Sequence, residues 1–224
     1  MNNTARQSKI RKKAIRWFNR FFSRISIALC SNMTNFIGRK RADYVFDFDI
    51  IRSSSLELVA HEIYENNTAG DVAELGVYRG DFAEKINKAF PDRKLYLFDT
   101  FEDFDEKDIE KEDQEGYSKE RHDFSKTNEK IVLKRMKFPE NCIIKKGYFP
   151  ETAKDIDNNF VFVSIDADLY EPIYQGLQFF YPRLVKGGYI FVHDYNESRY
   201  PGAKAAVKKF CKETDISFFP LSDI

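Results

Sequence analysis

Residues 160–195, FVFVSIDADLYEPIYQGLQFFYPRLVKGGYIFVHDY, determine the fold, because they read as a strand, a helix and a second strand. The first strand, residues 160–165, is almost wholly apolar, and the second spans residues 189–192. Uninterrupted apolar runs of this length are typical of parallel strands that are buried on both faces. Because the connection between such strands is nearly always right-handed, we expect the two strands to be neighbours in one parallel sheet.

The segment between the two strands is predicted to be a helix. Pro172 suits its first turn, where no backbone N–H is needed. Four apolar side chains recur at helical spacing and would share one face: Ile173, Leu177, Phe180 and Leu184. Gly187 and Gly188 are expected to end the helix, since glycine accepts the left-handed backbone of a helix cap.

Four polar side chains follow the two strands at their carboxyl ends. Asp166 and Asp168 come after the first strand, and His193 and Asp194 come after the second. Ligands of open α/β sheets bind beyond these ends, so the four side chains should meet there. Adjacent carboxylates repel one another unless a cation or proton intervenes. A divalent cation, most simply Mg²⁺, would remove that repulsion, and an imidazole would also admit Mn²⁺, Fe²⁺ or Zn²⁺. The alternative is that one or two of these acids cap the following helix.

Residues 71–80, DVAELGVYRG, are predicted to form an earlier strand and its turn, followed by a helix over residues 81–90. Gly76 and Gly80 would let the backbone approach a ligand closely, and the start of the helix favours a carboxylate or phosphate. The spacing is G-x-x-x-G and not the dinucleotide fingerprint G-x-G-x-x-G. Alone, this turn is a weak signal of ligand binding.

The strand predicted over residues 94–99 ends in Asp99, which is well placed to accept hydrogen bonds from ribose hydroxyls. A helix cap or a surface acid is the alternative. A third strand is predicted over residues 142–147. Tyr148 follows it and would pack either against an adenine face or in the core. The glycine turn and the acid about 20 residues later together favour a cofactor that contains a nucleoside.

Other elements are predicted from their apolar patterns. Helices are expected over residues 53–66, 128–137 and 203–212, the first capped by Ser53, Ser54 or Ser55, and a strand is expected to begin at residues 216–219. Glu102 to Glu115 contain nine acids and two lysines. Such a stretch predicts a solvated loop with a helix, or a lid that orders over a substrate. His122 and Asp123 follow it and would then face the pocket.

Charge is unevenly distributed along the 224 residues, although the formal net charge is zero. Residues 1–42 contain eleven Lys or Arg and no acid, whereas residues 43–224 carry a net charge of −11. We therefore predict a basic N-terminal extension followed by one α/β domain. The extension also contains aromatic residues at helical spacing. It would pack on its own domain or on a second subunit, lie as an amphipathic helix on anionic lipid, or be disordered.

The compartment is predicted from what the sequence lacks. No run approaches the 18 apolar residues of a membrane span, and the early apolar stretch is broken by Arg20 and Arg24. The cysteines have neither metal-binding nor redox spacing: Cys30, Cys142 and Cys211. A reduced cytoplasmic protein, peripheral at a membrane if the extension binds lipid, is the simplest account.

Five stretches together carry a resemblance to a known family. They are ELGVYRGDFA at 74–83, YLFDTFEDF at 96–104, KKGYFPET at 145–152, the stretch 164–195, and PGAKAAVKKF at 201–210. In order and spacing over residues 52–221, they resemble the macrocin O-methyltransferases, bacterial sugar O-methyltransferases of natural-product pathways that depend on S-adenosylmethionine and a metal. The resemblance implies a Rossmann-like class I methyltransferase fold, mostly parallel with helices on both faces. That fold normally ends in an antiparallel strand, which this chain is expected to lack.

The same resemblance implies site residues by position. Seven would hold S-adenosylmethionine: Glu74, Gly76, Tyr78 and Gly80 at its methionine part, Asp99 at its ribose, and Gly147 and Tyr148 at its adenine. Asp166 and Asp194 match the metal-binding acids. His193 replaces the first acid of the family's Asp-Asp-Tyr and can still be a ligand. Asp168 matches an acid near the transferred methyl group, and either Asp168 or Asp166 would be the base.

The resulting hypothesis is an S-adenosylmethionine-dependent, divalent-metal-assisted O-methyltransferase that acts on a hydroxyl of a sugar, glycoside or related small molecule. The alternative is a catalytically impaired binding protein with the same fold, anchored by its basic N-terminus to a membrane or a partner. The missing dinucleotide fingerprint disfavours a nicotinamide dehydrogenase, and the acidic main domain disfavours a nucleic-acid substrate. A homo-oligomer remains open.

Overall fold

The computed structural model describes residues 13–15, 17–18, 20–22, 49–118, 124 and 126–221. The chain divides into two compact units, Met1–Val45 and Phe46–Ile224. In the first unit the described residues are helical, with the side chains of Trp17 and Phe21 largely exposed. Most of the predicted basic extension lies outside the described residues, as do His122 and Asp123, so those predictions stay predictions.

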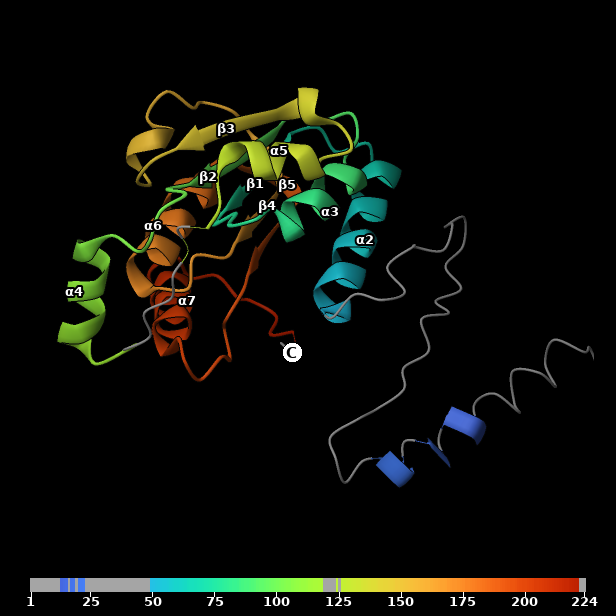
Figure 1. The fold of residues 1–224 in the computed structure, drawn as a ribbon. Coiled ribbons are helices and arrows are strands. Elements are labelled where there is room, and N and C mark those ends of the chain that lie inside the picture. Colours follow the sequence, from blue (N-terminus) through green and yellow to red (C-terminus); the bar gives the residue numbers. More distant parts are fainter. Residues whose placement is uncertain are drawn as a thin grey trace, which may run out of the picture. The chain divides into compact units, whose positions relative to one another are not determined.

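The second unit is built on five parallel strands (Figure 1), whose bounds are β1 Asp71–Leu75, β2 Leu95–Asp99, β3 Cys142–Lys146, β4 Phe160–Ile165 and β5 Leu184–Val192. Their order across the sheet is β3-β2-β1-β4-β5. Strands β2 and β3 therefore lie on one side of β1, and β4 and β5 lie on its other side. Ligands of such sheets bind outside the carboxyl ends where the order reverses, here between β1 and β4. The parallel α/β fold is confirmed.

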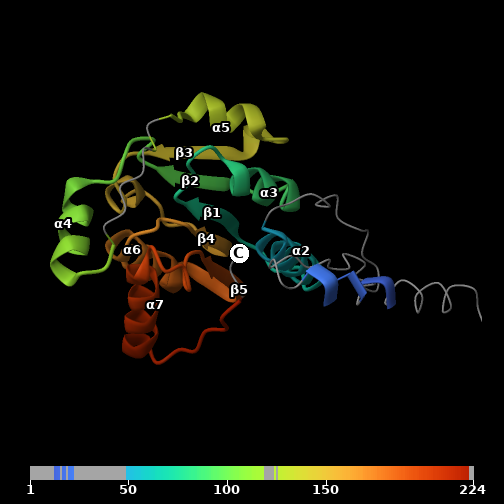
Figure 2. The ribbon, with the colours of Figure 1, turned by 60° about the horizontal axis from the view of Figure 1, so that its bottom comes forward.

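Five helices cover the two faces of the sheet: α2 Ile50–Glu65, α3 Asp81–Ala89, α5 Glu129–Arg135, α6 Tyr170–Phe180 and α7 Pro201–Thr214. A sixth described helix of this unit, α4 Glu106–Glu115, packs against α6. One apolar core joins α2, α3 and α5 to side chains such as Val72 of β1. The other joins α6 and α7 to Ala73 and Leu75 of the same strand. Figure 2 shows α6 and α7 side by side, away from α5. Within the described residues, no helix has the length and apolarity needed to cross a membrane.

The central strand β4 shows why the chain adopts this arrangement. All six of its residues are buried, as predicted for a strand covered on both faces. Phe160 packs edge to face against Phe180 of α6, with ring centroids 5.2 Å apart. On the opposite face, Phe162 packs against Phe90, which follows α3. This strand thus joins the two cores, and the residues that follow it are fixed in position at the edge of the sheet.

The end of α6 differs from the prediction. The helix stops at Phe180, and a short 3₁₀ turn, Tyr181–Arg183, leads into β5. Pro182 explains the early stop, because proline lacks the N–H that a continuing helix needs. The two glycines expected to cap the helix lie inside β5, as does Leu184. Gly187 has a φ of +84°, and the register with β4 shifts at this bulge.

Two other boundaries also differ from the prediction. Helix α2 begins at Ile50, where the side chain of Asp49 accepts a hydrogen bond from Arg52 N at 3.0 Å, so the predicted serine caps lie inside the helix. The strand expected at residues 216–219 is absent: residues 216–221 form no strand. A strand needs a partner edge, and among the described strands none pairs with this segment.

Candidate active site

A cleft opens at the carboxyl ends of β1 to β4, at the point where the strand order reverses. It holds about 720 Å³ of empty space, its open mouth included. Its lining includes seven of the predicted site residues: Gly76, Tyr78, Asp99, Gly147, Tyr148, Asp166 and Asp168. The lining does not include Glu74, Gly80, His193 or Asp194. Residues far apart in sequence thus meet at one site.

The turn after β1 is possible only because of its first glycine. Gly76 has a φ of +82°, and a Cβ atom there would lie 1.9 Å from the carbonyl oxygen of Asp166. The backbones that follow β1 and β4 therefore touch at this point, and Asp166 N donates to Leu75 O at 2.8 Å. Gly80 has a different setting. It precedes α3 with a φ of +81° and packs against Val132 and Met136 of the helix α5 region.

Asp99 ties the turns after β1 and β2 together. Its Oδ2 accepts hydrogen bonds from Val77 N at 2.6 Å and Tyr78 N at 2.8 Å, and its Oδ1 accepts one from Phe101 N at 2.6 Å. A carboxylate has about four acceptor positions, so these three bonds leave capacity for a ribose hydroxyl. The contacts also fix the carboxylate in place before any ligand arrives.

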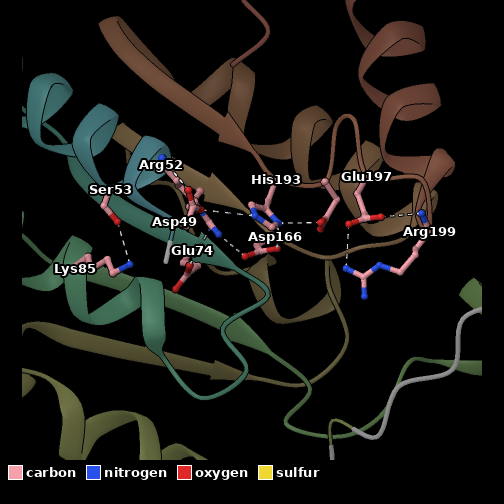
Figure 3. Close-up of polar contacts among 11 residues, drawn as sticks. Asp49, Arg52, Ser53, Glu74, Lys85, Asp166, His193, Glu197 and Arg199 are labelled. Atoms are coloured by element: carbon pink, nitrogen blue, oxygen red, sulfur yellow. Dashed lines mark hydrogen bonds and ion pairs between the residues drawn. The ribbon is translucent and has the colours of Figure 1, made fainter. Parts of the chain in front are cut away.

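Three of the four predicted metal-binding and catalytic side chains converge beside the cleft. We call Asp166, His193 and Asp194 the rim cluster. Their potential ligand atoms all lie within 4.8 Å of one another. Nδ1 of His193 is 3.1 Å from Oδ1 of Asp166 and 3.0 Å from Oδ1 of Asp194. Figure 3 shows Asp166 and His193 facing each other across the edge of the sheet.

The rim cluster contains polar atoms that the described residues leave unsatisfied. Despite the short distances, Nδ1 of His193 is buried with no partner in hydrogen-bonding geometry, and so is Oδ2 of the almost fully buried Asp194. Buried polar atoms normally have partners, so these two mark a place for an absent one. Both atoms could coordinate a divalent cation. The ligand set of two carboxylates and an imidazole suits Mn²⁺ as well as Mg²⁺.

Protonation of the rim cluster depends on its internal charges. Burial alone lowers the pKa of His193, but Asp166 and Asp194 outweigh it and raise that pKa to about 10. Burial and the repulsion of Asp166 and Asp194 raise the pKa of Asp168 well above its usual value. Asp168 lies in the cleft next to the rim cluster, with a left-handed backbone at a φ of +57°. Without a cation, the positive charge of the protonated His193 offsets the negative charge of Asp166 and Asp194, and Asp168 holds its proton more strongly than a free aspartate does.

Arg52 is a site residue that the sequence did not reveal. From α2, its guanidinium donates to Oδ2 of Asp166 and to Oγ of Ser164, both at 2.7 Å (Figure 3). Burial raises the pKa of Asp166, but Arg52 and His193 lower it below its usual range. Nothing in the sequence near Arg52 signals this contact, because Asp166 is 114 residues away.

Glu74 belongs to the same buried network and does not reach the cleft lining. Its Oε1 is 3.8 Å from the guanidinium of Arg52, and its side chain is almost fully buried. Burial raises the pKa of Glu74 well above its usual value, although Arg52 opposes this. Oε2 of Glu74 has no hydrogen-bond partner among the described residues. Glu74 is therefore a buried residue of β1 that lies beside Arg52, next to the turn that begins at Gly76.

Comparisons with known proteins found a matching family and a curated relative. The family model described as "Macrocin-O-methyltransferase (TylF)" matches residues 49–224. Demethyldecarbamoylnovobiocin O-methyltransferase from Streptomyces niveus is 27% identical over 186 residues, covering 75% of this chain and 68% of that protein.

Two solved structures share the fold. The O-methyltransferase NovP superposes with a TM-score of 0.60 at 24% identity, over 75% of this chain and 74% of its own. CalS11, a calicheamicin methyltransferase, superposes with a TM-score of 0.57 at 20% identity, over 70% and 69% of the two chains. At these identities, the likeness concerns the fold alone.

Proposed function

The chain belongs to the macrocin O-methyltransferase family and is therefore an S-adenosylmethionine-dependent O-methyltransferase, and we propose that its acceptor is a hydroxyl of a sugar or glycoside and that a divalent cation assists the transfer. The relative from Streptomyces niveus, a novobiocin-type O-methyltransferase, supports a glycoside-like acceptor. The observation that carries the metal proposal is the convergence of Asp166, His193 and Asp194 beside the cleft.

Residues of the cleft fit the methyl donor. The backbone turn at Gly76 lies at the open ends of β1 and β4, where the methionine part of the donor would lie. Asp99 is held with a free acceptor position for the ribose, and Gly147 and Tyr148 lie beyond β3 for the adenine. We propose these roles on the fit alone. For Glu74 and Gly80 the support is indirect, because neither lines the cleft. Glu74 lies near Arg52, and Gly80 packs against Val132 and Met136.

Residues of the rim cluster would hold the cation through the two unsatisfied atoms, Nδ1 of His193 and Oδ2 of Asp194, with Oδ1 of Asp166 facing them. When bound, a divalent cation lowers the pKa of a hydroxyl that coordinates it. Oδ2 of Asp166 is already held by Arg52, so this carboxylate offers one free oxygen.

Two acids, Asp166 and Asp168, were predicted as the base, and we propose Asp168. The pKa of Asp166 lies below its usual range because of Arg52, which makes it a weak proton acceptor. Asp168 lines the cleft, whereas Oδ2 of Asp166 is held by Arg52 and its Oδ1 faces the proposed cation, so Asp168 is the acid whose carboxylate is left for the substrate hydroxyl. The remaining contribution of the protein is to hold the attacking oxygen in line with the methyl group.

Replacement of one rim residue tests the metal role. Asp194→Ala should abolish metal-dependent methyl transfer to a sugar or glycoside acceptor, and calorimetry should show that S-adenosylhomocysteine binding changes less than about threefold, since Asp194 is outside the cleft lining. Titration with Mn²⁺ gives a readout that does not need an acceptor: the wild type should bind the ion, and the variant should not. Mn²⁺ binding of equal strength in both proteins would disprove the metal site.

The basic N-terminal extension, residues 1–42, and the domain of residues 43–224 are proposed on composition alone. The exposed rings of Trp17 and Phe21 support a surface that contacts something outside its own helix. Its own domain, a second subunit and an anionic lipid surface all satisfy that requirement, and the last two can be told apart by experiment. Light scattering would show a dimer in the case of a second subunit, and sedimentation with phosphatidylserine vesicles would show lipid binding in the case of a lipid surface.

A further inference from the structure

Helix α4 is an acidic helix with two acids turned inward. Asp108 and Glu112 are 5% and 1% exposed, whereas the other acids of the helix lie in more exposed positions. The sequence predicted that this stretch would be solvated, since burying an ionised acid is unfavourable without a partner. Each buried acid therefore needs an explanation. Glu112 has one, because it accepts hydrogen bonds from Tyr170 N and Ser118 N.

Asp108 is only half explained by its contacts. Its Oδ1 accepts a hydrogen bond from the hydroxyl of Tyr148 at 2.8 Å. Among the described residues, Tyr148 is the only side chain that hydrogen-bonds this carboxylate, which leaves Oδ2 available. Asp108 and Tyr148 both line the cleft. A buried carboxylate is thus held by one oxygen while the other is available to a donor in the cleft.

The order of the strands indicates which part of the methyl donor, S-adenosylmethionine, would lie next to Asp108. The rim runs from Tyr148 beyond β3, through Asp99 of β2 and Gly76 after β1, to Asp166 beyond β4. The methyl group must lie near Asp166, and the ribose near Asp99. The purine therefore extends to the β3 end of the cleft, where Tyr148 and Asp108 lie. An adenine presents a 6-amino group, which is a hydrogen-bond donor.

We propose that Asp108 is a specificity-determining residue whose Oδ2 accepts a hydrogen bond from the 6-amino group of adenine, with Tyr148 as the residue that positions the carboxylate. The inference rests on the proposed placement of the donor in this cleft. The raised pKa of Asp108, about 6 because of burial, still leaves the side chain mostly ionised at pH 7.5. An ionised carboxylate accepts strongly from an amine and repels a carbonyl oxygen.

A ligand pair that differs at the 6-position and the adjoining N1 of the purine tests the inference. S-adenosylhomocysteine carries the amino group, and S-inosylhomocysteine carries a carbonyl in its place and a hydrogen on N1. By calorimetry at pH 7.5, the wild type should bind the amino ligand more than about thirtyfold more tightly. Asp108→Asn should cut this preference by at least tenfold, because an amide group can donate to the carbonyl as well as accept from the amine. Tyr148→Phe should weaken S-adenosylhomocysteine about threefold to tenfold and keep a preference for it.

A matched control separates recognition from folding. Glu110→Gln removes a charge from the exposed side of the same helix and should leave both affinities unchanged. If the hydrogen bond between Tyr148 and Asp108 served only to hold α4 against the turn after β3, Asp108→Asn would lower the affinities for both ligands by the same factor. An unchanged ratio of the two affinities in that variant therefore overturns the inference. Failure of the wild type to bind S-adenosylhomocysteine at all would instead overturn the placement of the donor, and this inference with it.

Discussion

Individual residues decide whether the turns of this site can form. Gly76 is the clearest case, because its backbone touches the backbone of Asp166 and has a positive φ. The sequence marked this glycine as a place of close approach but expected the approach of a ligand. The structure shows that another strand end also comes close. That contact brings the cofactor turn and the rim cluster together.

Gly76→Ala should therefore be far more harmful than an alanine at a glycine with open surroundings. Gly116 provides the comparison, since it has a φ of +68° and a Cβ atom there would meet nothing within 4 Å. Gly116→Ala should lower the free energy of unfolding by about 1 kcal/mol, the cost of a left-handed backbone. Gly76→Ala should cost at least about 2 kcal/mol more, because the two backbones must separate. Urea denaturation measures both, and equal losses would contradict the contact.

Asp108 should make stability depend on pH. Burial raises its folded pKa to about 6, above the value of about 3.9 in an unfolded chain. The folded state thus binds the proton more tightly, so this group lowers stability as pH rises from about 4 to above 6. Asp108→Asn removes this cost and should stabilise the protein by about 1–2 kcal/mol at pH 7.5. The gain should shrink as pH falls below about 6 and vanish below about pH 3.5, where both states bind the proton. A gain that is independent of pH would contradict the buried charge.

Arg52 shows what a residue-by-residue reading of the sequence misses. Its neighbours along the chain are two isoleucines and three serines, which suggest only the start of a helix. Its partner Ser164 lies on β4, which pairs with β1, and its partner Asp166 directly follows that strand. A long-range ion pair leaves no local pattern, because it depends on how two elements pack.

Among the elements, helix α4 differs most from expectation. Its charge predicted a solvated segment, and yet Glu112 is buried between two helix starts. Oε1 of Glu112 accepts from Tyr170 N, the first residue of α6, at 2.7 Å, and lies 2.8 Å from where a Cβ atom of Gly202 in α7 would be. Helix N-termini favour a carboxylate, which explains how this acid can be buried. The attachment also holds α4 beside the turn that carries Asp166 and Asp168.

Glu112→Ala should detach this helix. It leaves two buried N–H groups without an acceptor and creates a cavity, so the free energy of unfolding should fall by about 2–4 kcal/mol. Hydrogen exchange should quicken across residues 105–118 more than in β1 or β4. Glu110→Ala, on the exposed side of the same helix, should change stability by less than about 0.5 kcal/mol. Equal effects of the two substitutions would show that α4 is not anchored through Glu112.

Across the whole molecule, the site is formed by the ends of four strands that are distant in sequence. A ligand in the cleft touches all four ends and should stabilise the folded state as a unit. S-adenosylhomocysteine at one hundred times its Kd should add about 2.7 kcal/mol of stability, which raises Tm by about 5–10 °C for a domain of this size. Differential scanning calorimetry measures the shift. A smaller rise at that saturation would mean that the ligand also binds the unfolded chain.

The sequence by itself determined the parallel α/β fold, the five strands of the sheet and the meeting of acids and imidazole at one edge, but it also predicted a strand at residues 216–219 that is absent. It determined the fold because apolar runs, strand direction and right-handed crossover are local or nearly local properties. The predicted end of α6 and the predicted start of α2 were wrong. Pro182 ends α6 before the expected glycines, and Asp49 caps α2 before the expected serines. Only the tertiary structure brought Arg52 to Asp166 and Tyr148 to Asp108. Those contacts join segments 114 and 40 residues apart, and nothing short of the packed fold fixes such pairs.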